Sequence, residues 1–194
     1  MARKKNFDRE EKLIQAMELF WQKGYANTSI ADIVEHLGIN RFSLYATYTD
    51  KETLYQEALQ YYLQHIGSIN QPLLTNPAAG IDNIITFFEV FTKIQRQQKS
   101  GCFLQNSILE RVNEDDSILQ YSDAYYEHLT QLLYSALNNS VKKGQLVPEI
   151  DAQMLSHFLI VQMQGIRVMG KARQYDTIDK ALSILINILN SYRK

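Results

Sequence analysis

The stretch TSIADIVEHLGINRFSLYATYTDK, residues 28–51, predicts two short helices joined by the turn LGI. Thr28 is the expected cap of the first helix and Asn40 that of the second, because short polar side chains accept hydrogen bonds from the free amides of a helix start. Two helices joined by so short a turn have the form of a helix-turn-helix. The apolar residues of the first helix return at helical spacing and are Ile30, Ile33, Val34 and Leu37.

The second short helix divides its residues between an inner and an outer face. A helix of this length is not stable alone, so its inward residues, Leu44 and Tyr48 by spacing, must anchor it. The outward residues are free for another task, and their side chains suit base edges and phosphates in a DNA major groove. These outward residues are Arg41, Phe42, Ser43, Tyr45 and Thr47.

Lys51 stands where a further helix begins, after the expected cap Asp50. A cation at a helix N-terminus opposes the helix dipole, and this cost is offset when a phosphate lies between the ammonium and the free backbone N–H groups. The stretch therefore predicts a surface that binds DNA. The alternative interpretation is a solvated face of an ordinary helical bundle.

The composition sets limits for such a surface. The chain has 194 residues, of which 45% are apolar, and this is enough for a sizeable core in one domain or two. Three prolines and eight glycines favour long helices. No segment resembles a membrane span or a signal sequence, so a cytoplasmic protein with no membrane partner is expected. The net charge of −1 means that a nucleic-acid surface must be local.

The rest of the chain is also predicted to be helical, and no stretch of it predicts a strand. The expected fold is all-α with about nine helices. The stretch NQPLLTNPAAG, residues 70–80, is the clearest linker-like segment. We expect a helix-turn-helix domain over residues 1–50 and a larger helical domain for effector binding and dimerisation over residues 51–194. The main apolar stripes of the larger domain cover residues 81–91, 125–137, 154–169 and 178–189.

The segment GYANTSIADIVEHLGINRFSLYATYTDKETLY, residues 24–55, resembles the DNA-binding signature of TetR-family transcriptional regulators. The resemblance covers residues 7–60 and implies a three-helix domain with the helix-turn-helix in its second and third helices. It also implies that Tyr45 touches phosphate or base and that Lys51 holds a phosphate. Phe42 stands where many relatives carry a small residue, so the base preference is open. The DNA-binding residues taken from the spacing or from this resemblance are Thr28, Ser29, Asn40, Arg41, Phe42, Ser43, Tyr45, Thr47, Tyr48 and Lys51.

Members of this family are typically homodimers joined through their last two helices. The two final apolar stripes, residues 154–169 and 178–189, are more apolar than terminal surface helices need. We therefore expect a homodimer, and the alternative is that these stripes only close the core of one chain. The expected interface residues are Met154, Phe158, Val161, Val168, Leu182, Leu185 and Leu189.

An effector pocket is expected from the many aromatic residues, because aromatic walls with a few polar groups are typical of ligand sites. The segment GCFLQNSILE, residues 101–110, also resembles part of the ligand-sensing half of one branch of the family. Core packing is the alternative explanation for each aromatic residue. The expected pocket residues are Tyr62, His65, Phe88, Phe91, Cys102, Phe103, Asn106, Tyr125, Tyr126 and Gln162.

Two further features leave alternatives open. Cys102 is the only cysteine, and its place near a helix start is compatible with a redox or electrophile sensor as well as with a buried inert thiol. The basic start, with Arg3, Lys4, Lys5 and Arg9, is either an arm that binds phosphate or solvated terminal charge.

The sequence contains no motif for catalysis or for a cofactor. The histidines lack metal-ligand spacing, and no glycine-rich phosphate loop occurs. We therefore expect a DNA-binding transcriptional regulator without a cofactor, and more specifically a repressor that a small-molecule effector releases from a palindromic operator. An activator would use the same residues. The other alternative is a helical small-molecule binding protein or enzyme that keeps a vestigial DNA-binding head.

Overall fold

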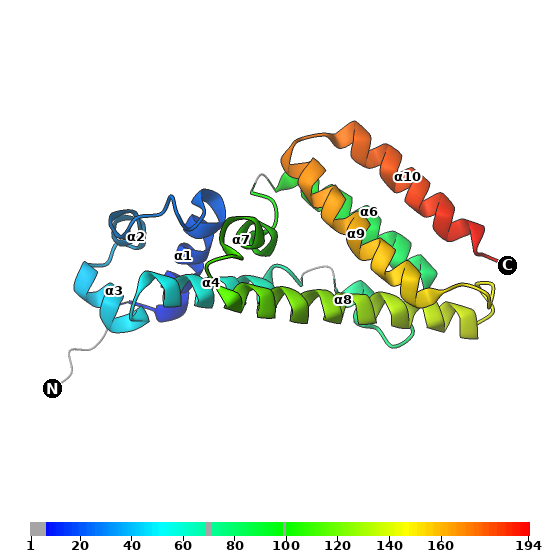
Figure 1. Ribbon diagram of the computed structural model, residues 1–194, viewed down its shortest axis with the longest axis horizontal. Helices are drawn as coiled ribbons and strands as arrows, with labels where there is room; N and C mark the ends of the chain where they lie inside the picture. Colours follow the sequence, from blue (N-terminus) through cyan, green and yellow to red (C-terminus); the bar gives the residue numbers. More distant parts are fainter. Residues whose placement is uncertain (1–6, 69–70, 99) are drawn as a thin grey trace. The chain divides into compact units, whose positions relative to one another are not determined.

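The computed structural model describes residues 7–68, 71–98 and 100–194, and in these ranges it contains ten helices and no strand (Figure 1). The predicted all-α fold is confirmed. The helices are α1 (Arg9–Lys23), α2 (Ile30–Leu37), α3 (Arg41–Tyr48), α4 (Lys51–His65), α5 (Pro72–Thr75), α6 (Ile81–Gln97), α7 (Phe103–Arg111), α8 (Asp116–Lys142), α9 (Ala152–Lys171) and α10 (Tyr175–Ser191).

The short helix α5 lies inside the segment that the sequence predicted as a linker, and its proline stands at the first helical position, where no amide is needed. None of the described helices combines the length and the apolar character needed to cross a membrane. Arg3, Lys4 and Lys5 of the basic start lie outside the described residues.

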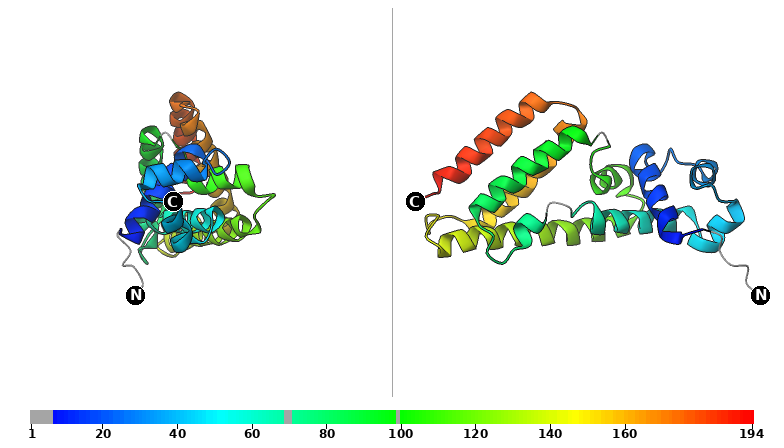
Figure 2. Two further views of the ribbon diagram at one scale, coloured as in Figure 1. Left: turned by 90° about the vertical axis from the view of Figure 1, so that its left-hand side faces the viewer. Right: turned by 180° about the vertical axis from the view of Figure 1, so that it is seen from behind.

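The chain forms two compact units. Within the described ranges, the first unit contains residues 7–67 together with 102–122, and the second unit contains the rest of residues 68–101 and residues 123–194. The predicted boundary at residue 50 separates two functions and stays a prediction, but the compact units do not follow it. Helices α4 and α7 pack together inside the first unit, as the views in Figure 2 also show.

The core of the first unit is built around α4, which packs along α1. Tyr55 of α4 is 1% exposed, and its ring contacts Phe20 of α1 and Phe103 of α7 edge to face at centroid distances of 5.1 and 5.3 Å. Its hydroxyl forms a hydrogen bond with the Ser107 hydroxyl at 2.7 Å. Burial raises the pKa of Tyr55 to about 12. Aromatic contacts and one buried polar bond therefore fix α7 to α4.

The second unit is built from α6, α9, α10 and most of α8. Ser140 of α8 is fully buried and its hydroxyl oxygen accepts a hydrogen bond from the Ile81 amide at 2.7 Å, which satisfies a free donor at the start of α6. Helices α6 and α9 approach closely at Gly170, where a Cβ atom would lie 2.8 Å from the Cβ atom of Gln95. Only glycine fits this contact without a shift of the backbone.

Candidate nucleic-acid interface

Helix α2, the first helix of the helix-turn-helix, begins at a reciprocal cap. The Ser29 hydroxyl oxygen accepts a hydrogen bond from the Asp32 amide at 3.1 Å, and the Asp32 carboxylate accepts one from the Ser29 amide at 2.8 Å. Lys23 donates to the same carboxylate at 2.8 Å, and this bond together with those from Ser29 holds the pKa of Asp32 below its usual range. The pair fixes the angle at which α2 leaves the preceding loop.

The prediction of Thr28 as the cap of α2 was wrong, because Ser29 occupies that position. Thr28 is fully buried, and its hydroxyl donates to the Gly24 carbonyl at 2.6 Å. Its side chain therefore supports the loop before α2. A buried hydroxyl that already donates a hydrogen bond within the chain cannot reach a DNA phosphate. We therefore no longer expect the Thr28 side chain to bind DNA.

Helix α3, the second helix of the helix-turn-helix, is capped and anchored. Asn40 is the N-cap, as predicted, and its side-chain oxygen accepts from the Ser43 amide at 2.8 Å. Leu44 and Tyr48 are each 1% exposed, which confirms the predicted inner face. The Tyr48 hydroxyl donates to the Arg9 carbonyl at 2.8 Å, and burial raises the pKa of Tyr48 to about 12. The prediction that Tyr48 binds DNA was wrong, because its ring is buried and anchors α3 to α1.

The outer face of α3 presents an arginine and two aromatic rings. Phe42 is 83% exposed and Tyr45 is 37% exposed, and the Arg41 guanidinium carbon lies 5.7 Å from the Tyr45 ring centroid. Ser43 and Thr47 are half-buried, and the Thr47 hydroxyl donates to the Ser43 carbonyl at 2.8 Å. A large apolar ring exposed at this point favours a partner that covers it, and a thymine methyl group in the major groove is such a partner.

Lys51 begins α4, whose N-cap Asp50 accepts a hydrogen bond from the Thr53 amide at 2.7 Å, as predicted. The Lys51 ammonium donates to the Tyr25 carbonyl at 2.7 Å and lies 3.9 Å from the centroid of the Tyr25 ring. Burial, and next the like charge of Arg111, lower the pKa of Lys51. The predicted phosphate contact of Lys51 stays a prediction, and the structure adds a partner within the chain that the sequence did not indicate.

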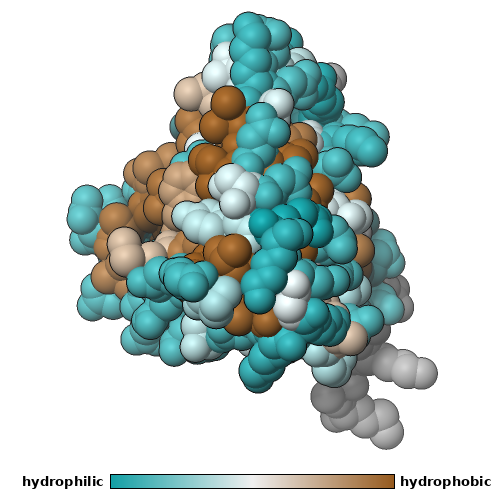
Figure 3. All heavy atoms as spheres, turned by 90° about the vertical axis from the view of Figure 1, so that its right-hand side faces the viewer, coloured by the Kyte–Doolittle hydropathy of each residue, from teal (hydrophilic) through white to brown (hydrophobic). Residues whose placement is uncertain are grey.

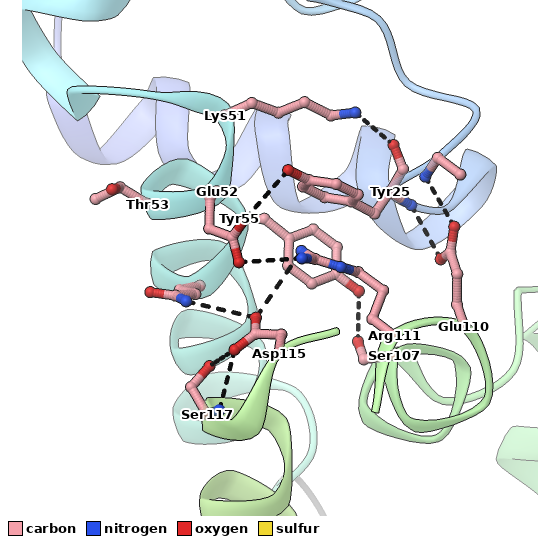
Figure 4. A network of polar contacts seen from close by, with 12 residues as sticks. Tyr25, Lys51, Glu52, Thr53, Tyr55, Ser107, Glu110, Arg111, Asp115 and Ser117 are labelled. Carbon is pink, nitrogen blue, oxygen red and sulfur yellow. Dashed lines mark hydrogen bonds and ion pairs between the residues drawn. The ribbon is translucent and has the colours of Figure 1, made fainter. Parts of the chain in front are cut away.

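Tyr25 is the centre of a polar network that joins the α1–α2 loop to α7 (Figure 4). The Glu110 carboxylate accepts hydrogen bonds from the Tyr25 amide at 3.0 Å and from the Ala26 amide at 2.8 Å. The Arg111 guanidinium carbon lies 3.6 Å from the Tyr25 ring centroid, and Arg111 donates to Glu52 at 3.0 Å. No local signal could have found Glu110, because it stands 85 residues from Tyr25 in the chain.

The similarity to known proteins agrees with this geometry. The model for bacterial regulatory proteins of the tetR family matches residues 13–58. The uncharacterized HTH-type transcriptional regulator YezE of Bacillus subtilis is 29% identical over 193 residues, which cover 95% of this chain and 100% of YezE. The HTH-type transcriptional repressor ComR of Escherichia coli is 28% identical over 186 residues, which cover 94% of this chain and 88% of ComR.

The solved structure of a cysteine mutant of the TetR family regulator CifR, complexed with 26 bp of operator DNA, has the same fold. Its TM-score is 0.78 at 24% identity, with 93% of this chain and 98% of the CifR chain covered. The N-terminal part of the chain, residues 13–58, is that of a TetR-family regulator. The chain is a DNA-binding transcriptional regulator, and its helix-turn-helix, α2 and α3, lies within the matched residues.

The expected effector-pocket residues are distributed over both compact units. In the first unit, Tyr62, Cys102 and Phe103 are buried, Asn106 is half-buried and His65 is exposed. In the second unit, the five residues range from fully buried to half-buried. These are Phe88, Phe91, Tyr125, Tyr126 and Gln162.

A buried arginine brings two of the expected pocket residues together in the second unit. Arg167 of α9 is 5% exposed, and it donates to the Tyr125 hydroxyl at 3.1 Å. Its guanidinium carbon lies 5.3 Å from the Phe91 ring centroid. The sequence reasoning missed Arg167, because an arginine within an amphipathic helix gives no sign of being buried.

A groove in the second unit was also missed by the sequence reasoning. It has a volume of about 680 Å³, lies between α8 and α9, and contains Tyr126 but no other expected pocket residue. Its walls carry carboxylates, hydroxyls, amides and aromatic rings. The lining residues are Asp123, Tyr126, Glu127, Thr130, Gln131, Tyr134, Gln153, Ser156, His157 and Ile160.

The expected dimer residues fall into an exposed and a buried group. Leu185 and Leu189 are 3% and 1% exposed, so they belong to the core of the second unit and their assignment to the interface was wrong. Leu182 is half-buried. The exposed group consists of Met154, Phe158, Val161 and Val168, joined by Met169 and Ile184, which were not among the expected interface residues. Figure 3 shows that apolar side chains reach the surface in patches among hydrophilic ones on one side of the molecule.

Proposed function

We propose that this TetR-family regulator is a cytoplasmic repressor, without enzymatic activity, that binds a palindromic operator as a homodimer and leaves it when a small-molecule effector binds. The observation that supports the proposal most directly is the outer face of α3, where Arg41, Phe42 and Tyr45 are exposed on a helix held by a cap and two buried anchors. A rigid helix that presents a cation and apolar rings is suited to base edges in the major groove.

The homodimer is supported by the exposed apolar residues of α9 and α10. Met154 is 70% exposed, Val161 65% and Ile184 60%, and all three are large apolar side chains. When a second copy of the chain covers such side chains, their apolar surface is removed from water, and this favours association. A two-fold dimer places two recognition helices on half-sites about 34–36 Å apart, which is one turn of DNA, or a multiple of it. This symmetry is the reason for proposing a palindromic operator.

Two features of the second unit support effector binding. The groove between α8 and α9 has a volume of about 680 Å³, which is in the range of small-molecule sites. The buried Arg167 beside Phe91 and Tyr125 supplies a charged group among aromatic rings. An effector needs to couple to the operator site by only about 1–3 kcal/mol to change operator occupancy several-fold or more.

Selection of bound duplexes from a random DNA pool at near-physiological salt tests the proposal. The wild type should enrich an inverted repeat. The double variant that carries Arg41→Ala and Tyr45→Ala should not enrich it, although it should keep its helical content. Lys180→Ala is the matched control, because Lys180 is an exposed cation on α10. Enrichment of a single half-site would contradict the homodimer. Equal enrichment by the wild type and the α3 variant would contradict the role of α3.

The effector part needs a separate experiment on the selected operator. A compound library is screened first for direct binding to the protein, and each binder is then tested for its effect on operator affinity. At least one binder should weaken operator binding if the protein is a repressor that an effector releases. Binders that all tighten operator binding would indicate an activator or a co-repressed regulator instead.

A further inference from the structure

The last residues of α7 hold the loop between α1 and α2. Glu110 accepts hydrogen bonds from two successive backbone amides of that loop, those of Tyr25 and Ala26, at 3.0 and 2.8 Å. The preceding residue, Gly24, has φ +80, and a Cβ atom there would lie 2.9 Å from a Glu110 carboxylate oxygen. The loop is therefore shaped to bring this carboxylate against its backbone. Hydrogen bonds from amides to a charged carboxylate are stronger than those between neutral groups.

Arg111 holds the side chain of the same loop residue. Its side chain is 4% exposed, and its guanidinium carbon lies 3.6 Å from the Tyr25 ring centroid and 5.3 Å from that of Tyr55. It donates a hydrogen bond at 3.0 Å to Glu52, the residue that follows Lys51 at the start of α4. A guanidinium that is shielded from water attracts an aromatic face more strongly than an exposed one does. Arg111 therefore fixes the ring of Tyr25 beside α4.

Tyr25 in turn holds Lys51. Its carbonyl accepts one hydrogen bond from the Lys51 ammonium at 2.7 Å, and its ring centroid lies 3.9 Å from the ammonium nitrogen. An ammonium has three N–H donors, so two donors remain for another acceptor. Lysine loses much rotational freedom when its side chain is fixed, and a side chain that is already fixed does not lose this freedom again on binding.

We propose that Glu110 and Arg111 are positioning residues for DNA binding, which act through Tyr25 to hold the Lys51 ammonium ready for a DNA phosphate. Neither residue touches DNA in this arrangement. The proposal rests on the DNA-binding function of the chain and on the predicted phosphate contact of Lys51. Through Tyr25 and Lys51, α7, which the sequence placed in the effector-binding part, then affects operator affinity.

The variant Glu110→Gln tests the proposal through the sign of its effect. DNA is a polyanion, so removal of a carboxylate by itself raises DNA affinity. The positioning role predicts the opposite, because a glutamine amide offers one acceptor oxygen and turns an N–H group toward the second loop amide. We expect operator affinity to fall about five- to tenfold, at the lower end of couplings between sites. The matched control is Glu114→Gln, which removes an exposed carboxylate of the same unit and should keep or slightly raise the affinity.

The salt dependence of operator binding distinguishes positioning from a general loss of structure. Loss of a phosphate contact lowers the slope of log affinity against log salt by about 0.9 for each phosphate. Lys51→Ala should therefore lower the slope, and Glu110→Gln should lower it in the same direction. In a double-mutant cycle, Glu110→Gln should have little further effect once Lys51 is alanine, because it acts through Lys51. Additive effects with an unchanged slope would overturn the proposal.

Two measurements complete the test. Hydrogen exchange of the free protein should show faster exchange of the Tyr25 and Ala26 amides in Glu110→Gln, and unchanged exchange with unchanged affinity would overturn the proposal. Tyr25→Phe keeps the ring and the carbonyl and should bind as the wild type does, whereas Tyr25→Leu should resemble Glu110→Gln. A wild type that enriches no duplex would refute operator binding itself. If the wild type binds DNA and the Glu110→Gln variant binds it equally well, only the positioning role is refuted.

Discussion

Helix α3 has eight residues and α9 has twenty, and the two helices expose apolar side chains in different settings. On α3 the most exposed ring is Phe42, which stands beside Arg41 on a helix held by a cap and two buried anchors. On α9 the exposed apolar residues recur at helical spacing, at Met154, Phe158 and Val161. Two aromatic rings beside a cation on a short helix are suited to a nucleic-acid groove, whereas a recurring apolar stripe on a long helix is suited to another protein surface.

The two helices also differ in what keeps them folded. Helix α3 depends on Leu44 and Tyr48 because its length gives it little stability alone. Helix α9 buries many residues against α6 and α10, and a further apolar side of it remains exposed. Changes in the anchors of α3 should therefore affect folding and DNA binding together, while changes in the exposed stripe of α9 should affect association, and operator binding only through association.

The largest effect is expected for Leu44→Ala, which removes a side chain that is 1% exposed. The cavity should lower the free energy of unfolding by about 3 kcal/mol, and operator binding should weaken with it. Urea unfolding followed by circular dichroism measures the change. The neighbouring Tyr45→Ala is the control, since an exposed side chain should alter stability by only about 0.5 kcal/mol while operator binding is still lost. A stable Leu44→Ala protein would show that α3 does not need this anchor.

A smaller effect is expected for Val161→Glu, which places a charge in the exposed stripe of α9, where Val161 is 65% exposed. Burial of an unpaired carboxylate between two copies should weaken dimerisation by about thirtyfold, or about 2 kcal/mol. Sedimentation over a range of concentrations gives the dissociation constant. Ser135→Glu, at an exposed position of α8, should leave it unchanged. A dimer of unchanged affinity in Val161→Glu would place the interface elsewhere.

The N-cap of α4 should contribute about 1 kcal/mol, as N-cap side chains usually do. Asp50→Ala removes the acceptor of the Thr53 amide, so the free energy of unfolding should fall by this amount. Asp50→Asn keeps an acceptor oxygen and should lose only a few tenths of a kcal/mol. The difference between the two variants in urea midpoint is the measurement. Equal midpoints for alanine and asparagine would mean that the hydrogen bond does not stabilise the start of α4.

The smallest effect is a dependence of stability on acid pH in the first unit. Hydrogen bonds from Thr53 lower the pKa of Asp50. Burial raises the pKa of Asp115, but hydrogen bonds from Ser117 and Gln56 and the charge of Arg111 together lower it below its usual value. In the unfolded chain both groups have the ordinary aspartate pKa of about 3.9. Their stabilisation is therefore complete well above pH 4 and is lost as the pH falls through the lower folded values.

Urea midpoints measured from pH 6 downward, taken at about half-unit steps, should show this loss. The double variant with Asp50→Asn and Asp115→Asn cannot titrate at these sites, so its midpoint should vary less over the same range. An equally steep decline in the double variant would assign the acid sensitivity to other carboxylates.

The sequence by itself determined the local features of the helix-turn-helix. Asn40 and Asp50 are caps because a short polar side chain can only act on the amides next to it in the chain. Leu44 and Tyr48 face inward because helical spacing alone puts them on one side. The exposure of Arg41, Phe42 and Tyr45 follows from the same spacing. Local rules are sufficient here because each feature depends on residues only a few positions apart.

The tertiary structure decided the features that depend on distant residues. The sequence predicted Thr28 as the cap of α2, but Ser29 is an equally suitable cap by type, and the burial of Thr28 leaves Ser29 in that position. Similarly, α10 is apolar on more than one side, and its packing against α6 and α9 determines that Leu185 and Leu189 belong to the core.

The contact between α7 and the α1–α2 loop is the clearest case. Periodicity places Glu110 on a helix but does not tell which backbone amides its carboxylate meets, because Tyr25 and Glu110 stand 85 residues apart. Lys51 carries a charge that the sequence assigned to a phosphate, and only the fold adds the Tyr25 carbonyl as its partner. Spacing along one helix determines which side of it faces inward, whereas the packing of several helices determines which groups meet there.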